Sequence, residues 1–541
     1  AGLDLLTGAW VEPSGTRTGR PREPVGGSRR RRSGNLSEGT TDMNATGESD
    51  GSIVPVNPAN NGGTEPPAES AEGRGPARRN TDQPNLHRTP KPEMRRSRGL
   101  LGVREAARKD RSLVFTALLH HLGEELLTSS FYDLKKQASA GVDGVTWQEY
   151  RQDLEDRIHD LHGRIHRGAF RAKPSKRAYI AKTDGRKRPL GIASLEDKIV
   201  QQALRTVLEC IYEEDFLGLS YGFRPRRSPH QALDALYVGI TEKRVNWILD
   251  ADIEGFFDNI DRDWLVKFME HRVGDKRIVR LIRKWLNAGV IEGTDWSDNG
   301  KGTPQGAVLS PLLANIFLHY VFDLWIDWWR KRNAPGNCIV VRYADDFVIG
   351  FEHEADARAC LEALQSRMSK FGLKLHPTKT RLIEFGERGW TRHRDEGNGK
   401  CETFDFLGFT HICTGTRRGD RFVIRRLTMA SRLRRTLARI GEGLRRRRHQ
   451  PIGLVGRWLA SVVRGWQGYH GVPLNYPRLM QFHEAIFHLW LAQLRRRSQR
   501  GKQRWTHERM GRLVRKHLPP AKITHPWPSI RHHARLRARA V

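Results

Sequence analysis

Residues Val341-Arg-Tyr-Ala-Asp-Asp-Phe-Val-Ile-Gly-Phe351 place two adjacent carboxylates, Asp345 and Asp346, between runs of β-forming apolar residues. Such runs predict two strands joined by a tight turn, with the two acids at the tip. Because neighbouring carboxylates repel each other, a strand pair that presents them is expected to bind cations there. A plain surface turn is the alternative, since Asp is common in turns, but the apolar flanks favour a buried hairpin.

A second acidic segment, Trp247-Ile-Leu-Asp-Ala-Asp-Ile-Glu-Gly-Phe-Phe-Asp258, lies upstream. We expect a strand at residues 247–253, in which alternation puts Asp250 and Asp252 on one face and the apolar residues on the other. An acidic strand beside an Asp-Asp hairpin would suit two hard cations about 4 Å apart, the arrangement used in phosphoryl transfer.

Five further motifs occur in order along the chain. They are Gly141-Val-Asp-Gly-Val-Thr146, Arg188-Pro-Leu-Gly-Ile192, Tyr221-Gly-Phe-Arg224, Gly302-Thr-Pro-Gln-Gly-Ala-Val-Leu-Ser-Pro-Leu-Leu-Ala-Asn-Ile-Phe317 and Phe404-Asp-Phe-Leu-Gly-Phe409. With the hairpin and the Asp252 strand, this series resembles the reverse transcriptases that bacterial group II introns encode, over roughly residues 105–541. The resemblance implies an RNA-directed DNA polymerase that copies intron RNA and also assists its splicing as a maturase.

The resemblance also implies roles for single residues. Asp252, Asp345 and Asp346 would be the catalytic metal ligands, holding two Mg2+ ions, with Mn2+ as the alternative. Phe257, five residues after Asp252, would pack against the sugar of the incoming nucleotide and exclude a 2′-hydroxyl, although it could also be an ordinary core aromatic. The remaining substrate-binding candidates are Lys182 and Arg188 for the triphosphate, Gln305 for the template–nucleotide pocket, and Lys379 for the primer or the metal-site backbone.

The positive charge is concentrated at the C-terminal end. Residues 411–541 hold 31 Lys and Arg and 4 Asp and Glu, a net +27 of the total +33. The arginines alternate with apolar residues at helical spacing, which favours a folded phosphate-binding surface over a disordered basic tail. The predicted nucleic-acid contacts are Arg445, Arg446, Arg447, Arg448, Arg464, Trp466 and Tyr469, although a Trp at helical spacing is more often a core residue.

The expected fold class is α+β, a right-hand polymerase with fingers, a palm built on an antiparallel sheet, and an α-helical thumb. We expect a disordered Gly/Pro/Ser-rich extension at 1–100, an N-terminal extension and fingers at 101–240, the palm at 241–415, the thumb and maturase region at 416–495, and a basic tail at 496–541.

Composition narrows the remaining choices. The five cysteines form no CxxC pair, which argues against a disulfide scaffold, a zinc finger or a cysteine-ligated nuclease. We therefore expect no C-terminal endonuclease, and we interpret His525, His532 and His533 as phosphate or surface contacts. No apolar run reaches the length of a membrane span and no signal peptide is evident, so we expect a cytoplasmic protein without a membrane partner.

The expected partners are group II intron RNA, target DNA and deoxynucleoside triphosphates, with a homodimer as an open alternative to the monomer. Two other functions compete: a reverse transcriptase from a defence or diversity-generating system, and a splicing-only maturase that has lost catalysis. The long basic C-terminal region and Arg464-Gly-Trp-Gln-Gly-Tyr469 favour the intron type over the first. The intact acidic triad argues against the second.

Overall fold

A four-stranded antiparallel sheet, the central sheet, carries the predicted hairpin. The computed structural model describes residues 98–532 except 182–186, 294, 299, 304–305, 398–400, 417 and 420. The sheet has the order β6-β7-β3-β8, formed by Cys338–Tyr343, Asp346–Phe351, Trp247–Ala251 and Arg381–Glu384. The hairpin prediction is confirmed, but the predicted 247–253 strand ends two residues early. Ile253 instead makes an isolated bridge with Leu375.

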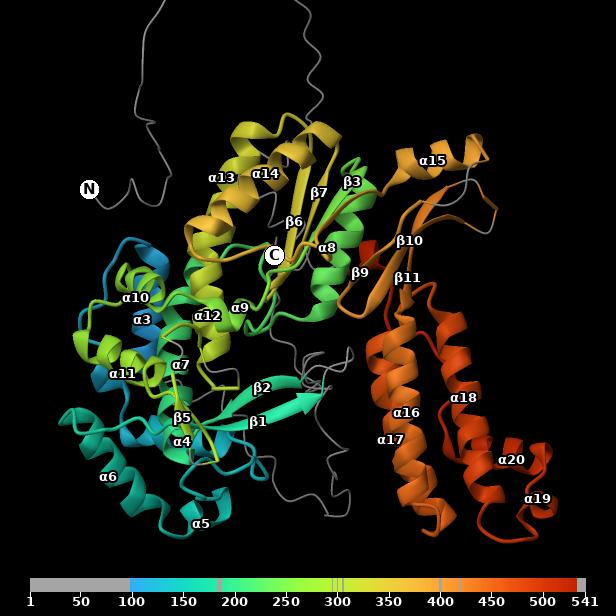
Figure 1. The fold of residues 1–541 in the computed structure, drawn as a ribbon, viewed down its shortest axis with the longest axis horizontal. Helices are drawn as coiled ribbons and strands as arrows, with labels where there is room; N and C mark the ends of the chain where they lie inside the picture. The colour runs from blue at the N-terminus through green and yellow to red at the C-terminus, as the bar shows by residue number, and fades with distance from the viewer. Residues whose placement is uncertain are drawn as a thin grey trace, which may run out of the picture.

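Helices cover both faces of the central sheet, so its strands are apolar on both sides (Figure 1). Val340 and Ile349 enter one core, while their neighbours Val341 and Val348 enter another. The covering helices are α8 (Pro229–Glu242) on one face and α12 (Ser310–Leu318), a π-helical turn (His319–Asp323), α13 (Leu324–Asn333) and α14 (Glu354–Lys370) on the other. Two-sided burial explains why the hairpin reads as a continuous apolar run rather than an alternating one.

The N-terminal part of the described chain is mainly helical and packs around α7 (Leu195–Asp215). Its other helices are α3 (Arg98–Lys109), α4 (Glu124–Asp133), α5 (Trp147–Gln152), α6 (Leu154–His166), α10 (Arg262–Glu270) and α11 (Lys276–Leu286). A second sheet beside them has the order β2-β1-β4-β5, formed by Lys187–Ile192, Ser175–Ala181, Val290–Glu292 and Asp295–Ser297. The extension predicted at 1–100 lies outside the described residues up to residue 97.

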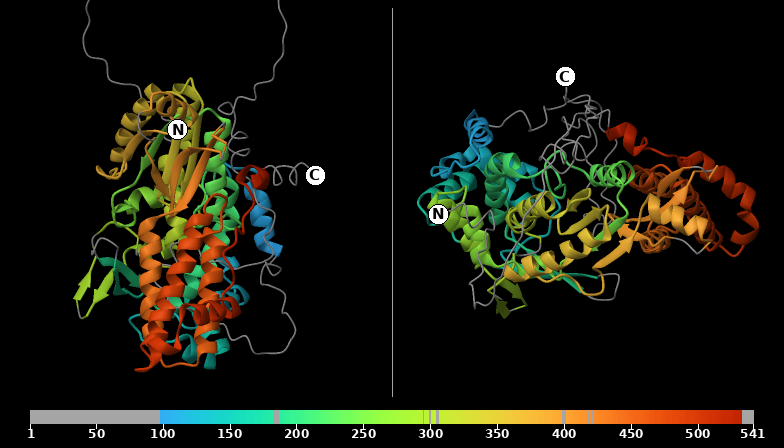
Figure 2. Two further views of the ribbon diagram at one scale, coloured as in Figure 1. Left: turned by 90° about the vertical axis from the view of Figure 1, so that its right-hand side faces the viewer. Right: turned by 90° about the horizontal axis from the view of Figure 1, so that it is seen from above.

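A helical bundle forms the opposite end of the molecule (Figure 2). It follows a three-stranded sheet made of β9 (Phe404–Phe406), β10 (Phe409–Gly415) and β11 (Phe422–Thr428), with α15 (Glu387–Asp395) packed on β10. The bundle helices are α16 (Ala430–Arg446), α17 (Ile452–His470), α18 (Tyr476–Arg495), α19 (Gly501–Arg504) and α20 (His507–His517). Trp490, Leu459 and Phe482 are among the apolar side chains of its separate core. The predicted α+β class is confirmed.

The segment after α20 runs back from the bundle to α8. There the buried Asp234 accepts hydrogen bonds from Arg426 on β11, at 3.3 Å, and from Arg531. The surface interpretation of His532 is wrong, because His532 is buried, whereas His525 is partly exposed and lies between the Gly468 carbonyl and Arg531. His533 lies outside the described residues. One buried carboxylate thus ties the end of the chain to the helix that covers the central sheet.

In the part of the chain that the structure describes, no helix is both long enough and apolar enough to cross a bilayer.

Candidate active site

The two adjacent acids stand at the tip of the β6–β7 hairpin. Tyr343 pairs with Asp346 across a two-residue link, and Ala344 has a φ of 58°, a conformation that tight hairpin links favour. Ala344 is buried, Asp345 is partly exposed and Asp346 is exposed. We call residues 343–346 the Asp-Asp turn. Its backbone is enclosed while its carboxylates reach the surface.

Asp252 follows β3 directly, next to this turn. In the β3–β7 register Ala251 lies opposite Phe347, so the next positions along the two antiparallel segments are Asp252 and Asp346. The backbone of Asp252 is fixed by a 2.7 Å hydrogen bond from the amide of His376 to its carbonyl. Its side chain is 24% exposed, and the ammonium of Lys379 donates to Oδ2. Asp252, Asp345 and Asp346 therefore lie at the same end of strands β3, β6 and β7 of the central sheet.

The acidic donor set fits hard divalent cations, which prefer carboxylate oxygens. Within the described residues, no three acidic, His or Cys side chains are already gathered closely enough to hold an ion. The Lys379 ammonium now supplies a positive charge to one oxygen of Asp252. An ion held by Asp252, Asp345 and Asp346 would therefore take the place of this lysine contact.

Asp250 shares the strand with Asp252 but has a different environment. Burial raises the pKa of Asp250 to about 6, and the charges of Asp405 and Asp252 act in the same direction. The guanidinium of Arg381, 3.7 Å away, opposes this rise. Asp250 therefore faces Arg381 and the β9–β11 sheet, and it does not join the metal-ligand candidates.

Gly222 of the Tyr221-Gly-Phe-Arg224 motif lies directly against the Asp-Asp turn. The Tyr221 amide donates to the Arg342 carbonyl at 2.8 Å, which aligns the motif with the edge of β6. A Cβ on Gly222 would lie 2.2 Å from the amide nitrogen of Ala344. Only glycine permits this approach, so the motif has a clear structural role in supporting the turn.

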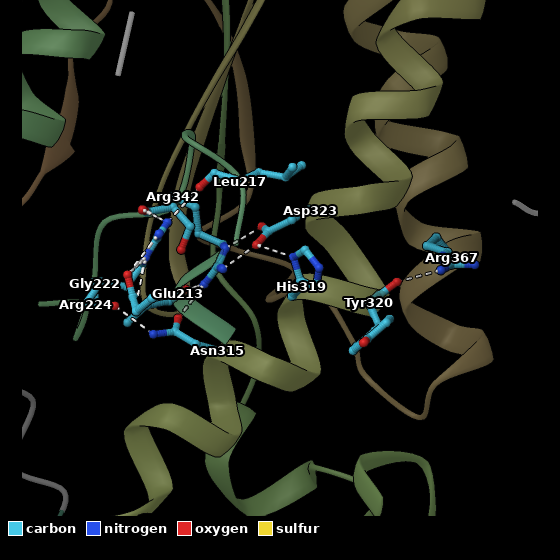
Figure 3. Close-up of polar contacts among 12 residues, drawn as sticks. Glu213, Leu217, Gly222, Arg224, Asn315, His319, Tyr320, Asp323, Arg342 and Arg367 are labelled. Atoms are coloured by element: carbon cyan, nitrogen blue, oxygen red, sulfur yellow. Dashed lines mark hydrogen bonds and ion pairs between the residues drawn. The ribbon is translucent and has the colours of Figure 1, made fainter. Parts of the chain in front are cut away.

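The side chain of Arg342 is buried and lies beside Asp323 and Asn315 (Figure 3). Its Nε and one terminal nitrogen each lie 2.6 Å from a carboxylate oxygen of Asp323, and both side chains are fully buried. The other terminal nitrogen donates to the Ala344 carbonyl at 2.8 Å and to Asn315 Oδ1 at 3.0 Å. Arg342, Asp323 and Asn315 were not predicted from the sequence as site residues. An arginine inside an apolar strand was the available signal, because a buried charge requires a partner.

Phe257 lies on the short helix α9 (Phe256–Asn259) and is 8% exposed. The amide of Thr303 donates to the Phe257 carbonyl at 2.9 Å, and Gly302, with a φ of 78°, packs on the same backbone. This contact anchors Gly302 and Thr303, which precede Gln305 in the sequence. Gln305 and Lys182 themselves lie outside the described residues, and of Arg188 only the backbone is described, paired with Ile180.

Comparison with known proteins decides the family. The family model for reverse transcriptase (RNA-dependent DNA polymerase) matches residues 180–411, which include the three acids. The chain is 31% identical over 317 residues to Protein YkfC of Escherichia coli (strain K12), covering 52% of this chain and 78% of that protein. The chain belongs to the reverse transcriptase family.

Intron-encoded members of the family are among its relatives. The chain is 38% identical over 226 residues to the group II intron-encoded protein LtrA of Lactococcus lactis subsp. cremoris, covering 41% of this chain and 37% of LtrA. It is 25% identical over 172 residues to the nuclear intron maturase 3, mitochondrial, of Arabidopsis thaliana, covering 30% of this chain and 23% of that protein. The predicted resemblance to group II intron-encoded reverse transcriptases is confirmed.

The predicted nucleic-acid residues of this reverse transcriptase occupy different environments in the bundle. Arg445, Arg446 and Arg464 are exposed, and Arg446 pairs with Glu442. Arg447 stacks on Trp458, with the guanidinium carbon 4.5 Å from the ring centroid, and Arg448 donates to Gln493 at 3.1 Å. Arg445, Arg446 and Arg464 are thus the exposed arginines of the predicted set.

Trp466 and Tyr469 have structural contacts in the reverse transcriptase. Trp466 is 8% exposed and stacks on Phe482 with ring centroids 4.4 Å apart, so the structure does not support its predicted contact with RNA. Its helical spacing matches the core alternative, because α17 turns this face into the bundle. The partly buried Tyr469 donates from its hydroxyl to the Leu407 carbonyl at 2.8 Å, which links α17 to the β9–β10 connection.

The Gly222 contact generates a prediction. Gly222→Ala should slow primer extension about 100-fold, because the new Cβ forces the Asp-Asp turn to shift by a large fraction of an ångström or more. Single-turnover extension of an RNA-templated primer measures the rate. Gly123→Ala is the control, because a Cβ there meets no atom within 4 Å. Equal rates for the two variants would show that the close approach does not set the turn.

Proposed function

We propose that the protein is an RNA-directed DNA polymerase encoded by a mobile group II intron, and that it copies intron RNA into DNA and assists splicing as a maturase. The observation that carries the polymerase part is the register that sets Asp252 beside Asp346, with Asp345 in the adjoining turn. Three carboxylates at one end of the central sheet are the ligand set that two Mg2+ ions need for nucleotidyl transfer, with Mn2+ as the alternative.

The carboxylates Asp252, Asp345 and Asp346 would hold the ions against the nucleotide and the primer end. When bound, such ions supply positive charge at the attacking and leaving oxygens. The chain's own contribution is to orient these carboxylates from a buried backbone, so that little rearrangement is needed at the moment of reaction. Lys379 neutralises Asp252 in the absence of an ion and would move toward phosphate once an ion binds.

Substrate selection would use residues around α9. Phe257 would form the wall against the sugar and favour deoxynucleoside triphosphates. Gln305 would line the template–nucleotide pocket. Lys182 and Arg188 would bind the triphosphate as positively charged donors.

The maturase role would belong to the basic C-terminal region, where Arg445, Arg446 and Arg464 are exposed on a bundle with its own core. Intron RNA and target DNA would bind there through phosphate contacts, with strong salt dependence. The protein would act in the cytoplasm, as a monomer or a homodimer. The sequence divisions at residues 101, 241, 416 and 496 are proposed as the limits of fingers, palm, thumb and basic tail.

The polymerase proposal predicts the outcome of a single substitution. Asp345→Ala should abolish primer extension on an RNA template with magnesium and deoxynucleotides, because a metal ligand is lost. The matched control is Glu484→Ala, which removes an exposed carboxylate on α18 and should extend normally. Near-normal extension by Asp345→Ala would overturn the assignment of the metal ligands.

The maturase proposal predicts that splicing and copying separate. Asp345→Ala combined with Asp346→Ala should leave splicing of the cognate intron largely intact, because the intron RNA performs that chemistry, while DNA synthesis ends. Arg445→Ala with Arg446→Ala should impair splicing more than extension on a simple template, since both side chains are exposed. The assay is intron splicing at near-physiological magnesium. A wild-type protein that does not promote splicing would remove the maturase claim and leave the polymerase.

A further inference from the structure

The ion pair beneath the Asp-Asp turn joins Arg342 and Asp323 through two hydrogen bonds. Arg342 and Asp323 are both 0% exposed, and the two carboxylate oxygens each accept from a different nitrogen of the guanidinium at 2.6 Å. Desolvating two charges is costly, and well-packed apolar residues often give equal or better stability at such positions. Stability alone therefore does not explain why a charged pair occupies this site.

The third nitrogen of Arg342 contacts the Asp-Asp turn and Asn315. It has two hydrogens, and both are used: one on the Ala344 carbonyl at 2.8 Å and one on Asn315 Oδ1 at 3.0 Å. Ala344 immediately precedes Asp345, so its carbonyl belongs to the peptide unit that carries the first carboxylate of the turn. Because the guanidinium of Arg342 is planar and rigid, its pairing with Asp323 also fixes the direction in which it donates to this peptide.

Asn315 closes the arrangement into a ring of contacts. Its Nδ2 donates to the Gly222 carbonyl at 2.8 Å, and Gly222 in turn lies against the Ala344 amide. The turn is thus held by a hydrogen bond to the Ala344 carbonyl from Arg342 and by close packing of Gly222 on its amide. Every member of the ring is buried in the described structure.

The π-helical turn at His319–Asp323 explains how one helix supplies both Asn315 and Asp323. Eight residues of regular α-helix rotate by about 800°, which would leave the two side chains about 80° apart around the axis. A π-helical turn absorbs one extra residue, so the spacing behaves like seven residues and the difference falls to about 20°. Such turns are rare and occur often at functional sites.

His319 on the same turn adds no competing charge. Its Nδ1 lies 3.9 Å from an Asp323 oxygen, and burial, aided by the charge of Arg342, lowers the pKa of His319 to about 3. The neutral imidazole therefore leaves the Asp323 carboxylate to Arg342.

We propose that Arg342 is a positioning residue for nucleotidyl transfer: held by Asp323 and Asn315, it fixes the Ala344 carbonyl and thereby the direction of the Asp345 carboxylate. The inference rests on the proposed polymerase function. Arg342 touches neither substrate nor reacting atoms. A lysine at this position would keep the charge but has a single nitrogen. It could not donate to Asp323 on one side and to Asn315 and the Ala344 carbonyl on the other, so it could not hold Asp323 and the turn together.

The test compares Arg342→Lys with Arg272→Met. Arg272 is also buried, with its partner Asp215 at 2.9 Å, but its other hydrogen bonds go to the carbonyls of Ala107, Asp110 and Leu113 in the N-terminal helical part. For each folded variant, three quantities are measured: kcat and KM for a deoxynucleotide, the affinity for Mn2+ without nucleotide by the EPR signal of free Mn2+, and the midpoint of urea unfolding.

Arg342→Lys should lower kcat about 100-fold with KM for the deoxynucleotide unchanged, and should weaken Mn2+ binding, because the Asp345 carboxylate is misdirected. Arg272→Met should lower the unfolding midpoint at least as much while keeping the wild-type kcat per folded molecule and the wild-type Mn2+ affinity. Asn315→Ala, which leaves the ion pair intact, should lower kcat about tenfold.

The inference is overturned if Arg342→Lys behaves like Arg272→Met and loses activity only in proportion to its unfolded fraction, or if Asn315→Ala has wild-type kcat and Mn2+ affinity. A wild-type protein that binds Mn2+ but does not extend a primer would remove the proposed polymerase function instead. In that case the Mn2+ affinities of the folded variants still decide the positioning role.

Discussion

The buried ion pair between Arg342 and Asp323 is the interaction on which the geometry of the site depends. It joins the hairpin strand β6 to the π-helical turn after α12, and Asn315, which accepts from Arg342, donates in turn to the Gly222 carbonyl. Because both charges are fully desolvated, either residue without the other would be strongly unfavourable. The pair is therefore an all-or-none constraint: when it forms, the Asp-Asp turn has one backbone position, and its carboxylates are directed outward from a rigid support.

A second constraint holds the basic bundle relative to this site. Asp234 on α8 accepts from Arg426 on β11 and from Arg531 near the end of the described chain, while α8 itself packs on β6. The bundle has its own apolar core, separate from the cores of the central sheet. Its position does depend on this carboxylate and on Tyr469, which bonds the Leu407 carbonyl. A polymerase that binds nucleic acid with the bundle and reacts at the end of the central sheet needs the bundle and the sheet held at a defined separation.

The sequence predicted the parts of the site that carry a local signal. Adjacent acids between apolar runs predicted the hairpin, and motif order predicted the family, because both features lie within short segments. Asp323 and Asn315 gave no such signal, since an acid and an amide in a helix are ordinary until a π-helical turn aligns them. The strand at Asp252 was predicted too long because its backbone leaves the ladder to bond His376, a partner distant in sequence. Trp466 was assigned to RNA because the surrounding arginines are visible in sequence, whereas the Phe482 ring that covers it is not.

The most direct test of the account is a crystal structure of the protein with an RNA-templated primer, Mg2+ and an incoming deoxynucleotide. The account predicts metal–oxygen distances of about 2.1 Å to carboxylates of Asp252, Asp345 and Asp346, with Lys379 displaced from Asp252. It also predicts that the hydrogen bond from Arg342 to the Ala344 carbonyl is unchanged, because the turn is positioned before substrate binds. Ions held by other residues, or a turn that moves away from Arg342 when substrate binds, would contradict it.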